Sequence, residues 1–221
     1  MSNVLITGTA KGIGQCTANL FLSKGYNVFG IDIVPSTINH PNYKHYCADV
    51  SKEAELPNLP IVPDIIINNA GIQTGTVRDI EVNLIGSILV TKKYACDKTS
   101  SILFNASASA ITGAEFDYYS ASKGGLVTYM KNVAIEYAKY GTTVNAISCG
   151  GVLTALNKPV MESRELWNKI MDITPLKKWA EPEEIADLIF YLTVTNKSIT
   201  AQNILIDNGE RDARDTFIWP D

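Results

Sequence analysis

Cysteine and histidine are both scarce in this chain of 221 residues, which has four cysteines and two histidines. The cysteines, Cys16, Cys47, Cys96 and Cys149, are far apart in the sequence and include no CxxC pair. This scatter argues against a zinc module and against a disulfide framework. We therefore expect free thiols in a reducing compartment, and we expect no metal site.

Long apolar runs and dense basic clusters are also missing. No stretch is long and apolar enough to span a bilayer, and the first residues, MSNVLI, lack the pattern of a signal peptide. Lys and Arg number 19 against 23 Asp and Glu, which gives a net charge of −4 with no basic patch. We expect a cytoplasmic protein that binds neither membranes nor nucleic acid.

Short apolar runs rich in β-branched residues alternate with segments of helical periodicity, in a chain that is 46% apolar. This alternation is typical of βαβ units. It predicts a single-domain α/β fold: a Rossmann-type, doubly wound sheet of about seven mainly parallel strands with helices on both faces. We expect the domain to span 1–210, with a tail at 211–221. The predicted strands lie at 3–8, 27–32, 44–50, 63–71, 101–107, 142–148 and 203–209.

A glycine-rich loop, TGTAKGIG at 7–14, lies between the first predicted strand and the first predicted helix. Glycines at this place permit a tight turn and a close approach of the backbone to a pyrophosphate, and the helix N-terminus attracts the anion. Turns without a ligand use similar loops, so the motif alone is weak evidence. The candidate phosphate-binding residues are Gly8, Lys11, Gly12, Ile13 and Gly14.

Asp32 closes the second predicted strand. A carboxylate at this position can accept hydrogen bonds from an adenosine ribose and repels a 2′-phosphate, which favours NAD over NADP. Lys11 favours the opposite choice, because a basic residue in the loop can pair with a phosphate. We give Asp32 more weight, since it is at the position that touches the ribose. The alternative for Asp32 is an ordinary turn residue.

Several motifs occur together and in order: TGxxxGIG, NNAG at 68–71, Asn83, a serine after the fifth strand, and YxxxK at 119–123. In this combination the chain resembles the short-chain dehydrogenase/reductase family over nearly its whole length. The resemblance implies hydride transfer between a nicotinamide cofactor and an alcohol or ketone. It also implies that a tyrosine exchanges a proton with the substrate oxygen.

Two adjacent tyrosines, Tyr118 and Tyr119, precede Lys123. Tyr119 and Lys123 are four residues apart and so share one face of a helix. A phenol titrates near ~10, and a nearby ammonium favours the phenolate. Tyr119 is therefore the expected catalytic acid and base with Lys123 as its partner, and Tyr118 is expected to line the substrate pocket.

The other catalytic residues come from the resemblance. Ser107 is expected to steady the substrate oxygen, and Asn83 to hold a water that joins Lys123 to a proton relay. Ser109, two residues beyond Ser107, is the alternative serine and otherwise lines the substrate pocket. The spacing from Ser107 to Tyr119 is one residue shorter than is usual in the family.

The resemblance extends to further cofactor and substrate contacts. Cys149 stands where the family usually has proline, either as a tolerated substitution or as a redox-sensitive thiol. Gly150 is expected in the substrate pocket. Tyr119 and Lys123 are expected to contact the cofactor as well, and the remaining cofactor-binding candidates are Asp49, Val50, Asn69, Ala70, Gly71, Val152 and Thr154.

Three segments bear on substrate and assembly. Residues 156–193 resemble the family's mobile substrate lid and the helix that follows it. The segments between Asp49 and 63–71, and between Gly71 and Asn83, are short, so their helices should be reduced to about a turn. The second loss shortens a helix that the family uses to dimerise, while 124–140 remains. We expect a homodimer or homotetramer.

The leading hypothesis is an NAD(H)-dependent oxidoreductase that interconverts a secondary alcohol and a ketone, with a small-molecule substrate. One alternative is an NADPH-dependent reductase of carrier-linked 3-oxoacyl groups. The other is a non-catalytic dinucleotide-binding protein, because fold alone does not decide function.

Overall fold

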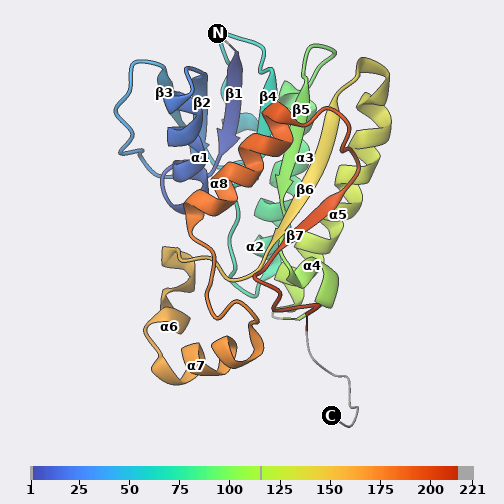
Figure 1. The fold of residues 1–221 in the computed structure, drawn as a ribbon. Helices are drawn as coiled ribbons and strands as arrows, with labels where there is room; N and C mark the ends of the chain where they lie inside the picture. Colours follow the sequence, from blue (N-terminus) through green and yellow to red (C-terminus); the bar gives the residue numbers. More distant parts are fainter. Residues whose placement is uncertain (1, 115, 214–221) are drawn as a thin grey trace.

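The computed structural model describes residues 2–114 and 116–213. Within them, seven strands form one sheet in the order β3-β2-β1-β4-β5-β6-β7, and each neighbouring pair is parallel. The predicted fold class is therefore confirmed (Figure 1). The strands are β1 (Asn3–Thr7), β2 (Asn27–Asp32), β3 (Tyr43–Cys47), β4 (Ile65–Asn68), β5 (Ser101–Asn105), β6 (Thr143–Cys149) and β7 (Asn203–Ile206).

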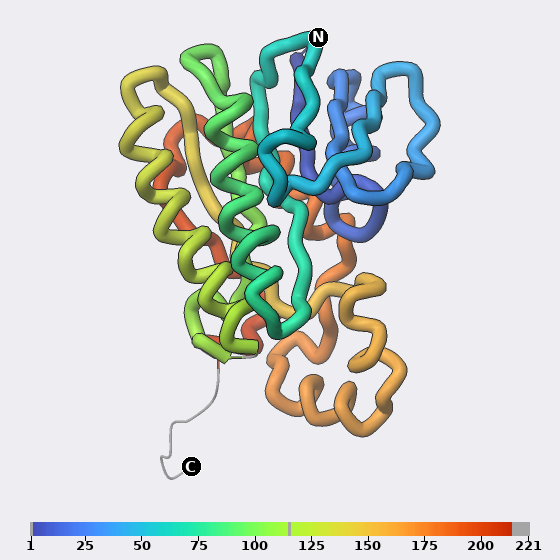
Figure 2. The backbone as a smooth tube through the Cα atoms, turned by 180° about the vertical axis from the view of Figure 1, so that it is seen from behind, coloured from blue at the N-terminus to red at the C-terminus, as the bar shows by residue number. Residues whose placement is uncertain are grey.

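Helices cover both faces of the sheet. α1 (Gly12–Ser23) and α8 (Pro182–Phe190) lie on one face, and α3 (Ser87–Tyr94) and α5 (Asp117–Tyr137) lie on the other (Figures 1 and 2). Successive side chains of a strand point to opposite faces. Val4 and Ile6 therefore pack with α1 and α8, while Leu5 joins the core under α3 and α5. Both faces are buried, which explains why the strands are continuous apolar runs.

α5 is the long helix that carries the YxxxK pair. Its buried face includes Leu126, Met130 and Val133, which pack on the sheet as their spacing predicts. A short 3₁₀ turn, Ala138–Tyr140, follows, and Gly141 ends the helix with φ at 74°. Glycine adopts this left-handed conformation without strain, which suits it to the end of a helix.

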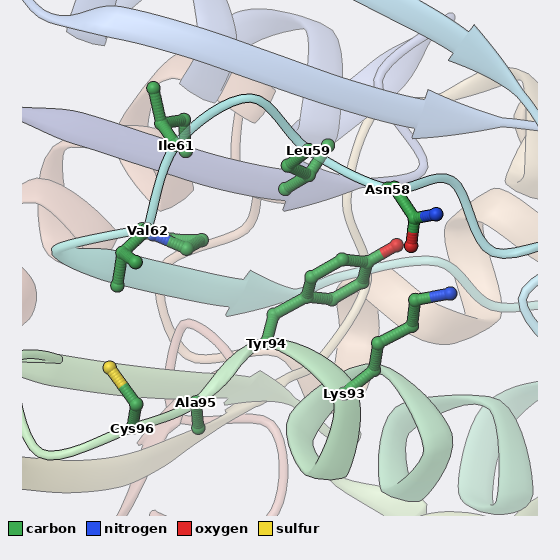
Figure 3. Close-up of a pocket in the computed structure, with 9 residues that line it drawn as sticks. Asn58, Leu59, Ile61, Val62, Lys93, Tyr94, Ala95 and Cys96 are labelled. Atoms are coloured by element: carbon green, nitrogen blue, oxygen red, sulfur yellow. The ribbon is translucent and has the colours of Figure 1, made fainter.

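The two short connections are as compressed as expected. Between β3 and β4 the only helix is a 3₁₀ turn, Glu53–Glu55, and the rest of the segment rests on α3. Tyr94 Oη donates to the Pro57 carbonyl at 2.6 Å, and Lys93 Nζ to the Leu56 carbonyl at 2.6 Å. A pocket of about 280 Å³ remains between this segment and the end of α3 (Figure 3).

The second short connection, after β4, holds α2 (Val77–Asp79), which continues through a π-helical stretch, Ile80–Gly86, into α3. Several strands end earlier than predicted: β3 at Cys47 rather than at residue 50, β4 at Asn68 rather than at 71, β5 at Asn105 rather than at 107, and β7 at Ile206 rather than at 209. After β3, a turn begins in which Asp49 Oδ1 accepts hydrogen bonds from the Ser51 amide at 3.0 Å and the Ser51 hydroxyl at 2.7 Å.

Of the segment 156–193, the lid part that precedes α8 forms a projection below the carboxyl ends of the strands, while α8 packs on the sheet (Figure 1). It contains a 3₁₀ turn at Ala155–Asn157, α6 (Lys158–Met161) and α7 (Arg164–Ile173). In the described part of the chain, no helix has the length and apolar character needed to cross a bilayer. Most of the expected tail, residues 214–221, lies outside the described residues.

Candidate functional site

The predicted site residues gather at the carboxyl ends of β1, β2, β4, β5 and β6 and at the start of α5. The strand order reverses between β1 and β4, which are neighbours in the sheet although β2 and β3 lie between them in sequence. The connections from these two strands leave the sheet's carboxyl edge toward opposite faces. Ligands of doubly wound proteins bind in this place.

The glycine-rich loop passes very close to the loop after β4. A Cβ on Gly14 would lie 1.9 Å from the Gly8 carbonyl oxygen, and a Cβ on Gly8 would lie 2.9 Å from Ala70 Cα. Gly8 and Gly12 have φ at 75° and 56°, which glycine adopts readily. The loop thus leads into the N-terminus of α1 while its glycines pack closely against the loop after β4. Lys11 is exposed at the N-cap position, and Ile13 is half-buried in the first turn.

Asn69 joins three strand ends. Its Nδ2 donates to the carbonyl oxygens of Thr7 and Gly8, at 2.9 and 3.2 Å, and its Oδ1 accepts from Asn105 Nδ2 at 2.9 Å. Thr7 Oγ1 accepts from the amides of Asn69 and Ala70, both at 3.0 Å. The NNAG segment is therefore tied to the glycine-rich loop on one side and to β5 on the other.

Asp32 lies at the end of β2 beside the glycine-rich loop. Its Oδ2 accepts from the Ala10 amide at 2.9 Å, and its Oδ1 accepts from the Val34 amide at 3.2 Å. Each carboxylate oxygen has two lone pairs. One on each oxygen is left for the paired hydroxyls of a ribose.

Asp49 is braced from two sides. Besides its turn with Ser51, its Oδ2 lies 3.0 Å from Arg78 Nη2, and these hydrogen bonds and the arginine charge hold its pKa below the usual value despite the opposing effect of burial. Val50 is buried against Gly86, where a Cβ would lie 2.7 Å from Val50 Cγ2. The turn that carries these two cofactor-binding candidates is thereby fixed to α2 and the π-helical stretch.

Tyr119 and Lys123 are both buried on the same side of α5, and Lys123 Nζ lies 5.7 Å from the centre of the Tyr119 ring. Lys123 Nζ donates to the Asn105 carbonyl at 2.7 Å. Burial lowers the pKa of Lys123 to about 8, although Cys149 and the buried carboxylate of Asp79 act to raise it. As predicted from the sequence, Tyr119 is therefore the tyrosine that lies beside Lys123.

Tyr118 is exposed on the other side of the helix, with 44% of its surface accessible. Its place in a substrate pocket stays a prediction.

Asn83 is fully buried in the π-helical stretch, and its side chain is used for bracing. Its Oδ1 accepts from the Ile72 amide at 2.8 Å, and its Nδ2 donates to the Ile72 carbonyl at 2.9 Å and to Ser122 Oγ at 3.0 Å. A Cβ on Gly71 would lie 3.2 Å from Asn83 Oδ1 and 3.3 Å from Lys123 Nζ. The position next to Gly71 where a side chain would begin is therefore close to both Asn83 Oδ1 and Lys123 Nζ.

Ser107 and Ser109 form a pair, which distinguishes their roles. Ser107 Oγ accepts from the Ser109 hydroxyl at 2.9 Å and from the Ser109 amide at 3.2 Å. A hydroxyl that accepts twice still has its own proton to donate. Ser107 can therefore donate to a substrate oxygen, while Ser109, the first residue of α4 (Ser109–Thr112), orients it.

Cys149 is buried at the end of β6, where its thiol donates to Asn105 Oδ1 at 3.5 Å. Burial raises its pKa to about 12, even though Lys123 acts to lower it. The thiol is therefore protonated at neutral pH and a poor nucleophile. This geometry favours the tolerated substitution over a redox-sensitive thiol.

The loop after β6 connects the site to the lid. Gly150 lies so close to β7 that a Cβ would be 2.6 Å from Asp207 Cβ, so its expected place in the substrate pocket stays a prediction. Val152 is buried and bridges to Ala180, and a Cβ on Gly12 would lie 3.4 Å from Thr154 Cγ2. The loop that carries the cofactor-binding candidates Val152 and Thr154 thus borders the glycine-rich loop.

Trp179 joins the lid to the body. It covers Gly151, where a Cβ would clash with its ring, and it meets Trp167 of α7 edge to face, with ring centres 5.2 Å apart. The apolar face predicted for the lid is only partly covered. Trp167, Ile170 and Met171 are half-buried, whereas Met161 is exposed.

The comparisons with known proteins agree with this geometry. A family model described as Enoyl-(Acyl carrier protein) reductase matches residues 8–210. The uncharacterized oxidoreductase YxbG of Bacillus subtilis (strain 168) is 28% identical over 98% of this chain and 92% of its own length. The short chain dehydrogenase adrF of Penicillium roqueforti is 32% identical over 93% of this chain and 95% of its own length. The chain belongs to the short-chain dehydrogenase/reductase family.

A solved structure has the same fold as this short-chain dehydrogenase/reductase. A 4-hydroxyisoleucine dehydrogenase complexed with NADH matches with a TM-score of 0.91 and 26% identity, covering 97% of this chain and 100% of that one. The protein is thus an oxidoreductase of a family whose members bind nicotinamide dinucleotides.

Sequence reasoning missed two buried residues in the site of this short-chain dehydrogenase/reductase. Asn105 accepts hydrogen bonds from Lys123 and Cys149 and donates one to Asn69. The sequence pattern that could have identified it is a polar residue at the end of the apolar run SILFN. Asp79 is fully buried and accepts from the Thr74 amide, the Thr74 hydroxyl and the Gly75 amide, at 2.8, 2.8 and 2.9 Å. No local pattern marks Asp79, because its donors come from a loop whose path is set by the shortened connection.

The residues present fit a nicotinamide dinucleotide. The glycine-rich loop leads into the N-terminus of α1, whose unpaired amides and partial positive charge suit a pyrophosphate. Asp32 has acceptor capacity for one ribose. Within the described residues, the Lys123 ammonium makes one hydrogen bond, which leaves donors for the hydroxyls of the other.

Gly14→Ala is expected to abolish cofactor binding. The new Cβ would meet a backbone oxygen at 1.9 Å, so the glycine-rich loop must move away from the helix N-terminus that it presents. A titration with NADH, followed by energy transfer from tryptophan, measures this loss. Gly25→Ala, at the end of the same helix, is the control: it has φ at 82° and open space around the new Cβ, so it should cost about 1 kcal/mol of stability and leave NADH binding intact. Undiminished NADH binding by Gly14→Ala would contradict the assignment of this loop.

Proposed function

We propose that this protein is an NAD(H)-dependent oxidoreductase that interconverts a secondary alcohol and a ketone. The observation that carries the proposal is the pairing of Tyr119 with the buried ammonium of Lys123. A bound nicotinamide dinucleotide supplies or accepts the hydride. The protein's own residues must then hold the substrate oxygen and move its proton.

Tyr119 is the proposed acid and base. A positive charge beside a phenol stabilises the phenolate, so Lys123 makes proton exchange at Tyr119 Oη feasible near neutral pH. Because the pKa of Lys123 is lowered only to about 8, most of the ammonium keeps its charge at pH 7. The donors left on Nζ support a second role, in which Lys123 holds the ribose next to the nicotinamide.

Ser107 is proposed to hold the substrate oxygen. Its oxygen accepts two hydrogen bonds from Ser109, so its own proton is left to donate to another group. A preoriented donor stabilises charge that develops on the oxygen during hydride transfer. A water-sized group beside Gly71 would contact Asn83 and Lys123 together, which supports the proton relay suggested for Asn83.

The preference for NAD(H) rests on Asp32, with support from the NADH complex of the similar 4-hydroxyisoleucine dehydrogenase. The second candidate is a reductase of carrier-linked acyl groups that uses NADPH. The exposed Lys11 and the description of the matching family model favour it. Asp32→Ala should relax discrimination against NADPH if Asp32 sets the preference.

The proposed substrate is a small molecule. We also propose a homodimer or homotetramer assembled through α5, on which Ile135 is 78% exposed. A cytoplasmic location is part of the same proposal.

Tyr119→Phe is expected to lower turnover about 10²- to 10⁴-fold, the usual contribution of a positioned acid or base. NADH affinity should stay within about two-fold, because the lost hydroxyl acts on the substrate and not on the cofactor. Steady-state rates with a panel of ketones and an NADH titration measure the two effects.

Tyr118→Phe is the matched control, since it removes the same hydroxyl one residue away, on an exposed side chain. It should keep turnover within about three-fold of the wild type. Substantial turnover in Tyr119→Phe, or equal losses in both variants, would show that Tyr119 is not the acid and base.

Ketone reduction is expected to fall as the pH rises through about 8. Lys123 loses its proton there, because burial lowers its pKa, and the neutral amine no longer stabilises negative charge on Tyr119. The measurement is kcat/KM for the ketone at saturating NADH from pH 6 to 10, with circular dichroism to verify folding. A profile that stays flat to pH 10 would mean that the ammonium is not required.

A further inference from the structure

A chain of hydrogen bonds runs along β3 beside the glycine-rich loop. Thr9 Oγ1 lies 2.9 Å from Tyr43 Oη, Tyr43 Oη lies 3.0 Å from His45 Nδ1, and His45 Nε2 lies 2.9 Å from the Val34 carbonyl. Thr9 belongs to the loop that binds the phosphates, and Val34 follows Asp32 in the turn that meets the ribose. Neither Tyr43 nor His45 is a residue that the family motifs single out.

The direction of these hydrogen bonds follows from their end point. A carbonyl oxygen only accepts, so His45 Nε2 must carry the proton and donate to Val34. Nδ1 of the neutral imidazole then accepts from the Tyr43 hydroxyl, and Tyr43 accepts in turn from Thr9. Each donor is used once, and the fully buried hydroxyl of Thr9 is satisfied.

The chain closes into a ring through Asp32. Ala10, next to Thr9, donates its amide to Asp32 Oδ2, and Val34 donates its amide to Asp32 Oδ1. The ring therefore joins the two segments that would hold the pyrophosphate and the ribose, and the Asp32 carboxylate is clamped between them. Each carboxylate oxygen keeps one lone pair that accepts no hydrogen bond within the ring.

Gly30 provides the space for this ring. A Cβ at Gly30 would lie 2.3 Å from Tyr43 Oη and 2.4 Å from Thr9 Oγ1. Gly30 pairs with His45 in the sheet, and Asp32, two residues further along β2, points to the same face. The absence of a side chain in the middle of a buried strand is thus explained by the hydroxyls that take its place.

We propose that Tyr43 and His45 are positioning residues that determine the choice between NADH and NADPH. They fix the place and orientation of Asp32 relative to the glycine-rich loop, without touching the cofactor themselves. A rigidly held carboxylate accepts hydrogen bonds from both ribose hydroxyls and repels a 2′-phosphate. A more mobile carboxylate forms weaker hydrogen bonds to the ribose and repels the 2′-phosphate less. This inference rests on the proposed NAD(H) preference and adds the residues that enforce it.

Tyr43→Phe tests the proposal, because it removes two links of the ring and leaves the Thr9 hydroxyl unsatisfied. The dissociation constant for NADH should rise about five-fold, as expected for the loss of one buried hydrogen bond that binding depends on. The constant for NADPH should stay the same or fall, because a loosened Asp32 repels the 2′-phosphate less. Turnover at saturating NADH should be unchanged, since the ring does not reach the nicotinamide.

Tyr46→Phe is the matched control. It removes the same hydroxyl from the same strand, and the buried Tyr46 hydroxyl has no hydrogen-bond partner among the described residues. Both dissociation constants should stay at the wild-type values. His45→Phe is the second variant: it keeps a ring to stack on Tyr43, whose centre is 6.1 Å away, and should reproduce the Tyr43→Phe result.

The outcomes separate this inference from the proposed function. If the wild type prefers NADH and both ring variants keep that preference unchanged, the ring proposal is wrong and the NAD(H) assignment stands. If the wild type prefers NADPH or binds neither cofactor, the NAD(H) assignment itself fails. Equal loss of both cofactors in Tyr43→Phe would indicate a general loss of folded protein and would overturn the specificity role.

Discussion

The site depends on a single buried ammonium group. Lys123 projects from α5 onto the end of β5 and donates to the Asn105 carbonyl, with almost none of its surface in contact with solvent. Burial of a charge is costly unless neighbouring groups compensate, and here burial lowers the pKa to about 8 without removing the charge at neutral pH. The nearby carboxylate of Asp79 and the dipole of the Asn105 carbonyl supply that compensation.

The ammonium is also one end of a continuous set of hydrogen bonds. From Lys123 it passes to Asn105, then to Asn69, and then to the carbonyls of Thr7 and Gly8 in the glycine-rich loop. This set crosses the ends of β5, β4 and β1, which the sheet order makes neighbours. The group expected at the nicotinamide end and the loop expected at the pyrophosphate are therefore fixed relative to each other by the sheet.

Much of this was predictable from the sequence, because the information was local. The seven strands, the end of α5 at Gly141 and the register of Tyr119 with Lys123 follow from periodicity and glycine placement. The early end of β3 was not predictable from the sequence, because the turn formed by Asp49 and Ser51 competes with the strand. Asn105 was missed because its partners Asn69 and Lys123 are 36 and 18 residues away in sequence. The contact of Tyr43 with Thr9 spans 34 residues, and Asp79 was missed because no local pattern predicts the path of the loop that brings Thr74 and Gly75 to it.

The most direct test of the account is a calorimetric titration of the wild type and of Lys123→Met with NADH. Methionine keeps most of the side-chain volume and removes the charge and the donors. We expect one NADH per chain for the wild type and an affinity at least about ten-fold weaker for the variant, because the variant loses hydrogen bonds to a charged group. Equal affinities would contradict a cofactor role for Lys123, and no binding by the wild type would contradict the assignment of the site.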